Sequence, residues 1–66
     1  MEYSIVKALK KKLEGDIERS KVNISVYLNQ SVGIGEHPQH LEEIDKQLQK
    51  IVDAQEKLKE LQAFKL

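Results

Sequence analysis

The chain lacks the residues that cross-link or stiffen most small domains. Its 66 residues include no cysteine and no tryptophan, one proline and three glycines, and aromatic residues make up 5%. Without cysteine there is neither a disulfide nor a thiolate ligand for zinc, the usual supports of a domain near the lower size limit. A β-sandwich normally contains more aromatic residues. Packed helices and self-association are the remaining sources of stability.

The chain also lacks an excess of charge and a long apolar run. Its 11 basic and 11 acidic residues balance, whereas proteins that bind nucleic acid usually carry a basic excess. No apolar run is long enough to span a bilayer, and the first residues lack the basic-then-apolar order of a secretion signal. We therefore expect a cytoplasmic protein that binds no membrane and has no main role on nucleic acid.

Helix-forming residues are abundant. Charged residues make up 33%, and Lys, Glu, Gln and Leu are frequent. In the first half, positions three and four apart form an apolar stripe on one face of a helix. Its members, with one serine among them, are Val6, Leu9, Leu13, Ile17, Ser20, Ile24, Tyr27 and Leu28. Gly15 could end a helix, but the stripe keeps its phase across it, so we predict one helix over residues 2–30.

Residues 22–28 carry a competing pattern. Val22, Ile24, Val26 and Leu28 alternate with mostly polar residues, as they would in a β-strand. No other stretch of the chain offers a partner strand, and a single strand would leave its backbone groups unpaired. We therefore favour helix over strand here.

A second face of the first helix is less polar than a solvent-exposed face usually is. Ala8, Gly15, Val22 and Val26 project in nearly the same direction from a helix. This face is either an ordinary surface with tolerated valines or a second packing surface. We favour self-association, because Ala8 and Gly15 would let another helix approach closely.

Four lysines near the start of the chain form a basic cluster: Lys7, Lys10, Lys11 and Lys12. Their charge opposes the helix dipole, so helix stability does not explain them. We expect them to form salt bridges with acidic residues of the second helix. Those residues are Asp53, Glu56 and Glu60. Contact with nucleic acid is the alternative, weakened because no aromatic residues are interleaved for base stacking.

A turn at residues 31–37 separates the two halves. Gly33 and Gly35 can adopt positive φ, and Pro38 suits the first turn of a helix. There is no charged residue from Val22 to Gly35. The glycines and the proline are sufficient for a turn, so the turn does not explain the apolar and aromatic side chains at this end. We interpret these side chains as a surface for a partner protein, formed by Tyr27, Val32 and Ile34.

The second half carries a clearer stripe, which predicts a helix over residues 38–64. Its members are Leu41, Ile44, Leu48, Ile51, Leu58 and Leu61. Gln55 and Gln62 also fall in this stripe. Two interpretations stay open: these glutamines set the register or oligomeric state, or the hairpin widens towards its open end.

Two helices of similar length joined by a short turn predict an all-α fold, an antiparallel hairpin forming one domain over residues 1–66. The register brings Ile17 near Ile51. Contact along one stripe buries too little apolar surface to offset the entropy lost on ordering the chain. We therefore predict that two copies join through the first helix as a dimeric four-helix bundle.

The turn also carries a resemblance. The run Val32-Gly33-Ile34-Gly35-Glu36-His37-Pro38, with Val26-Tyr27-Leu28-Asn29 before it and Leu41 and Ile44 after it, resembles short uncharacterised helical proteins of tailed phages of aquatic bacteria. The resemblance covers about residues 15–64, and the turn is its most specific part. It implies a viral origin, with a location in the host cytoplasm or the virion.

The sequence shows no convincing motif for a nucleotide, a metal ion or a catalytic site. Gly33 and Gly35 lack the rest of a nucleotide-binding motif, and His37 with His40 fits helix capping better than a metal site. There is no nucleophile with a matching base, and one small chain cannot enclose a substrate pocket. We predict no catalytic residue, metal or cofactor.

The expected function is therefore a non-enzymatic structural or protein–protein interaction module that self-associates as a homodimer. Another protein would bind at the uncharged end. The alternative is a small nucleic-acid-binding regulator that uses the four lysines. The phage resemblance would make the chain a virion component or a factor that modifies a host protein.

Overall fold

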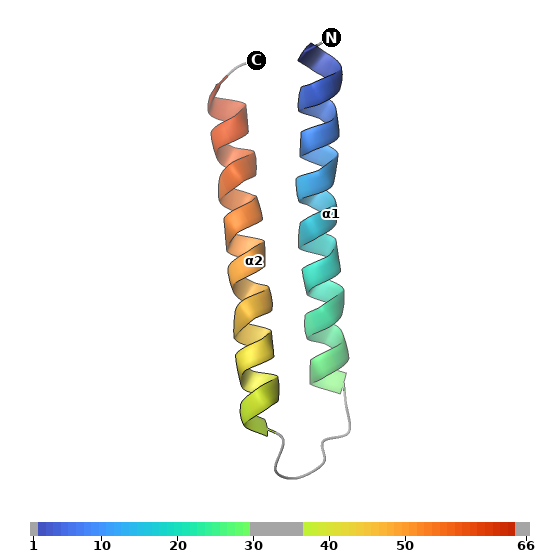
Figure 1. Cartoon of the computed structure of the whole chain (residues 1–66), viewed down its shortest axis with the longest axis vertical. Helices are drawn as coiled ribbons and strands as arrows, with labels where there is room; N and C mark the ends of the chain where they lie inside the picture. Colours follow the sequence, from blue (N-terminus) through green and yellow to red (C-terminus); the bar gives the residue numbers. More distant parts are fainter. Residues whose placement is uncertain (1, 30–36, 65–66) are drawn as a thin grey trace.

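The computed structural model describes residues 2–29 and 37–64, which form two antiparallel α-helices (Figure 1). α1 spans Glu2–Asn29 and α2 spans His37–Ala63. The helices lie side by side, with both chain termini at one end (Figure 1). The predicted all-α hairpin is confirmed.

The helix boundaries lie within one residue of those predicted. Residues 22–28 are helical, so the helical interpretation of the alternating segment is confirmed. α2 begins at His37, one residue earlier than expected, and ends at Ala63. After it, the Phe64 N–H donates to the carbonyl oxygens of Glu60 and Leu61, at 3.2 and 3.3 Å. The rest of the predicted turn lies outside the described residues.

The hairpin is long and thin. Its principal extents are 52 × 15 × 11 Å and its radius of gyration is 15.5 Å. A compact domain of this length would have a radius of gyration of about 11 Å. Because two helices alone form the layer, each can bury only the side that faces the other.

The core is correspondingly small. Within the part of the chain that the structure describes, three hydrophobic side chains are buried, Leu13 and Ile17 from α1 and Ala54 from α2, and the half-buried Ile51 and Leu58 pack against them. The expected neighbours Ile17 and Ile51 thus share one cluster. Along α2, positions alternately four and three apart are buried or half-buried, which keeps them on one side of the helix. They are His40, Ile44, Gln47, Ile51, Ala54, Leu58 and Leu61.

This row is rotated from the stripe that the sequence predicts. Gln47 and Ala54 face α1, whereas Leu41 and Leu48 are 71% and 50% exposed. Gln55, placed in the stripe by its spacing, is exposed as well. The apolar stripe of α2 is wider than the contact with one neighbouring helix, so part of it remains uncovered. The hairpin therefore leaves leucines exposed that the sequence assigns to the core.

Candidate functional site

The outer α1 face consists of Ala8, Gly15, Val22 and Val26, and all four residues are exposed. Val22 and Val26 are 60% and 51% exposed. A methyl group built on Gly15 would meet no atom within 4 Å outside its own stretch of helix. This face is therefore open, as the prediction of a self-association surface requires.

A second apolar surface was not predicted. We call it the leucine strip, and it consists of Leu28, Leu41, Leu48 and Val52. The α2 members project within about 40° of one another at 3.6 residues per turn. Leu28, from the last turn of α1, is 68% exposed, and Val52 is 46% exposed. The strip thus combines residues of both helices.

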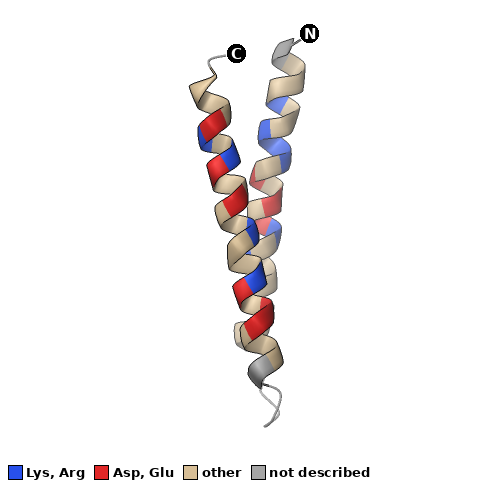
Figure 2. Cartoon of the chain, turned by 60° about the vertical axis from the view of Figure 1, so that its left-hand side comes forward, with Lys and Arg blue, Asp and Glu red and all other residues tan. Residues whose placement is uncertain are grey.

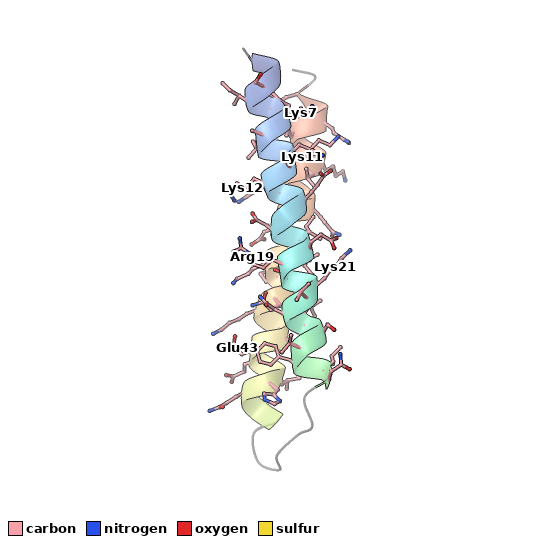
Figure 3. All side chains as sticks on the ribbon, turned by 90° about the vertical axis from the view of Figure 1, so that its right-hand side faces the viewer. Lys7, Lys11, Lys12, Arg19, Lys21 and Glu43 are labelled. Carbon is pink, nitrogen blue, oxygen red and sulfur yellow. The ribbon has the colours of Figure 1, made fainter. Side chains whose placement is uncertain are left out.

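Charged residues line the opposite side of the hairpin. A shallow cleft of about 310 Å³ has Leu13, Ser20 and Ala54 among its lining residues. Charged side chains from both helices border it, and we call it the charged cleft. Its charged residues are Asp16, Arg19, Lys50, Asp53 and Lys57. In Figure 3, Lys12 and Arg19 project to one side of α1 and Lys21 projects to the other.

The spacing along each helix places the strip and the cleft on opposite sides. Nine residues are two and a half turns, so residues nine apart point in opposite directions. Leu41 is nine residues before Lys50, and Leu48 is nine residues before Lys57. On α1, Leu28 is nine residues after Arg19. One side of the hairpin is therefore charged, and the other is apolar in the half nearer the turn.

Polar residues interrupt the seam between the helices near its middle. Ser20 and Gln47 are only 2% and 7% exposed. The Asn23 side-chain amide donates to Gln47 Oε1 at 3.3 Å, which joins the two helices. Among the described residues, no buried side-chain nitrogen or oxygen lacks a hydrogen-bond partner. This polar layer fixes which residues of α1 and α2 face each other, because any shift would leave the amides unpaired.

Asp16 in the charged cleft has a lowered pKa. The Lys12 ammonium donates a 2.8 Å hydrogen bond to Asp16 Oδ2 and lowers the pKa of that carboxyl below its usual 3.8. Partial desolvation raises the pKa, and the positive charges of Lys12, Arg19 and Lys57 lower it further. The pair is a surface ion pair within α1, one helical turn apart.

Lys10, Lys11 and Lys12 do not form the expected salt bridges to α2. Lys12 pairs with Asp16, and neither Lys10 nor Lys11 has an ion-pair partner within 4.0 Å among the described residues. Lys7, Lys10 and Lys11 project within about 100° of one another, whereas Lys12 projects to the other side of α1. Figure 2 shows blue bands near the N-terminal end of α1 and both colours along α2. Lys7, Lys10 and Lys11 line one hollow on α1 together with Val6 and Glu14.

At the turn end, Tyr27 is half-buried and contacts His40 of α2. The ring centroids are 5.6 Å apart and the ring planes are inclined at 51°. This contact agrees with the place of Tyr27 in the apolar stripe of the first helix, and it gives Tyr27 a role in joining the helices besides the predicted partner surface. The other two predicted partner residues, Val32 and Ile34, lie outside the described residues.

The open end carries a further groove of about 440 Å³. Apolar side chains line it, including Leu9, Leu61 and Phe64. Mostly acidic residues from α2 border it. These are Asp53, Glu56, Lys57 and Glu60. The acidic residues that the sequence assigns to the lysine cluster thus also border a groove.

Within residues 2–29 and 37–64, no three metal-binding side chains lie close enough to hold an ion. Neither helix, over the part that the structure describes, is apolar enough to cross a bilayer. Comparison of the chain with protein-family models, curated proteins and solved structures finds no match.

Proposed function

We propose that the chain is a non-enzymatic structural module that self-associates and offers its uncharged turn end to a partner protein. One observation carries the first part of the proposal. Among the described residues, three hydrophobic side chains are buried, whereas nine large ones are exposed. Solvent-exposed surfaces of monomers normally carry such residues singly, not aligned along a helix.

The exposed area supports the same conclusion. The chain exposes 5567 Å². A compact monomer of its mass, 7.6 kDa, would expose about 4,300 Å². The excess of about 1,300 Å² is larger than the roughly 800 Å² that each partner buries in a typical specific interface. The surface that a second copy could cover is therefore at least as large as that of a typical specific interface.

Self-association predicts that stability depends on concentration. If folding is coupled to pairing, the thermal unfolding midpoint rises with protein concentration. Circular dichroism of the full chain at two concentrations a hundredfold apart tests this. A midpoint that is the same at both concentrations would contradict the proposal.

Two surfaces are available for the contact between copies. The sequence predicts the outer α1 face, and the structure adds the leucine strip. A dimer through either surface contains four helices, as the predicted four-helix bundle does. The phage resemblance is compatible with a self-assembling component of a virion, which would use such a contact.

For the partner protein, the supporting feature is the absence of charge around the turn. Affinity capture from a host extract, with wild type compared with Tyr27→Glu, tests this part. Circular dichroism of the variant checks that its helices still form. A protein that wild type retains and the helical variant loses would support the proposal. Equal retention by both would contradict the role of Tyr27.

A further inference from the structure

We infer that the leucine strip, and not the outer α1 face, is the surface on which a second copy of this chain docks. The two hairpins would pair side against side, with their charged clefts facing outwards. This inference rests on the proposed self-association and names the surface responsible for it.

The strip lies next to core residues that one hairpin only half covers. Ile24, Ile44 and Ile51 are half-buried, and the strip continues their apolar surface around α2. A second hairpin on this side would cover the strip and the remaining exposed parts of these isoleucines together. The outer α1 face offers no such gain, because it points away from α2 and adjoins no half-buried core residue.

The direction of the α2 stripe agrees with this arrangement. The sequence stripe through Leu41, Ile44, Leu48 and Ile51 is centred between the row that faces α1 and the leucine strip. In a four-helix bundle each helix contacts two neighbours, so its apolar stripe is centred between them. In a hairpin whose only contact is the one between α1 and α2, a narrower stripe on α2 would be enough, and it would be centred on the side that faces α1. The wide stripe is thus the pattern of a helix with a second neighbour.

The chemistry of the strip fits a second copy of itself. The strip contains only aliphatic side chains, and Lys21 of α1, which projects to this side, is held by Glu18 at 3.6 Å. About a two-fold axis, the strip meets the same strip, so apolar surface covers apolar surface. The opposite side could not pair in this way, since charges of both signs from its cleft would have to be desolvated.

The area available is sufficient for a stable pair. The excess exposed area of about 1,300 Å² per chain exceeds the roughly 800 Å² per partner of a standard interface. The strip takes its residues from both helices on one side. The outer α1 face contributes one helix with two small residues, Ala8 and Gly15, among its four members.

The test compares two lysine substitutions at similarly exposed positions. Leu48→Lys places a charge in the strip, and Val22→Lys places the same charge on the outer α1 face. Sedimentation velocity of the full chains gives the dissociation constant of each. We expect Leu48→Lys to raise it by at least about 100-fold, equivalent to about 2.7 kcal/mol, because two copies of the residue meet in each dimer. Val22→Lys should change it by less than about threefold.

The opposite result separates this inference from the proposed function. A wild-type dimer that Val22→Lys dissociates and Leu48→Lys leaves intact would overturn the strip while leaving self-association standing. A wild-type chain that is monomeric at every concentration would overturn both.

Cross-linking provides a second test if Leu48→Lys does not fold. Because the chain has no cysteine, Leu48→Cys and Val22→Cys each introduce a single thiol. Neighbouring helix axes in a bundle lie about 8–10 Å apart. A thiol cross-linker that reaches about 15 Å can therefore join even two helices that lie diagonally opposite each other in a four-helix bundle. Cross-linked dimers from Leu48→Cys and none from Val22→Cys support the strip, and the reverse overturns it.

Discussion

Gly15→Ala tests directly whether the outer side of α1 is open. Gly15 lies in the interior of a 28-residue helix and is exposed. A methyl group at this position would contact nothing within 4 Å beyond the local helix. The substitution therefore changes the conformational freedom of the chain without disturbing any contact within the hairpin.

The expected gain follows from helix propensity. Glycine in a helix interior costs roughly 0.5–1 kcal/mol relative to alanine, because the unfolded chain loses more freedom at glycine. With no steric penalty, Gly15→Ala should stabilise the folded protein by that full amount. For a domain of this size, 1 kcal/mol corresponds to a shift of about 4–8 °C in the unfolding midpoint.

The assay is urea unfolding followed by circular dichroism, with wild type and variant at the same protein concentration. Ala8→Gly is the matched control, because Ala8 is exposed on the same face and should lose what Gly15→Ala gains. A loss of stability in Gly15→Ala would refute the reasoning. It would mean that another helix packs closely against Gly15, as in a dimer formed through the outer α1 face.

Three further outcomes follow from the described contacts. Lys12→Met should raise the pKa of Asp16 towards 3.8 in a carboxyl NMR titration, and an unchanged pKa would contradict the hydrogen bond. Since that pKa is depressed, the stabilisation by the pair is fully present above the unfolded value of 3.8 and is lost as the pH falls through the lower folded value. Asn23→Leu should lower the free energy of unfolding in urea by about 1 kcal/mol, because it leaves Gln47 without its donor. The double variant with Gln47→Leu should recover most of that loss. Additive losses of stability in the two single variants and the double variant would argue against the hydrogen bond. Ile17→Ala should cost about 2–5 kcal/mol, enough to abolish the helical circular dichroism of so small a core, and a fully helical variant would place the core elsewhere.

The helices could be predicted from the sequence because their signals are local. Apolar spacing kept its phase across Gly15, and the alternating segment from Val22 had no partner strand, so helix was the consistent solution. Glycine and proline positions then separated the two halves. The side of α2 that faces α1 could not be predicted in the same way. Gln47 and Leu48 lie at opposite edges of one wide stripe, and the spacing does not show which edge packs on α1. Which edge faces α1 depends on how Ser20 and Asn23 pack across the seam.

The candidate site could be predicted only in part. The exposure of Val22 and Val26 follows from their position opposite the stripe. The leucine strip was missed because Leu41 and Leu48 were counted as core, although Val52 marks a second apolar direction. The expected pairing of Lys12 with α2 was also wrong. Spacing alone does not show that Lys12 reaches an acidic residue within its own helix in preference to α2.

In the proposed assembly, one hairpin is half of the folded protein. Sedimentation equilibrium of the full chain over micromolar to hundred-micromolar concentrations measures this directly. We expect a mass of about twice 7.6 kDa at the upper end, with dissociation on dilution. A mass of 7.6 kDa throughout, with undiminished helical circular dichroism, would contradict it.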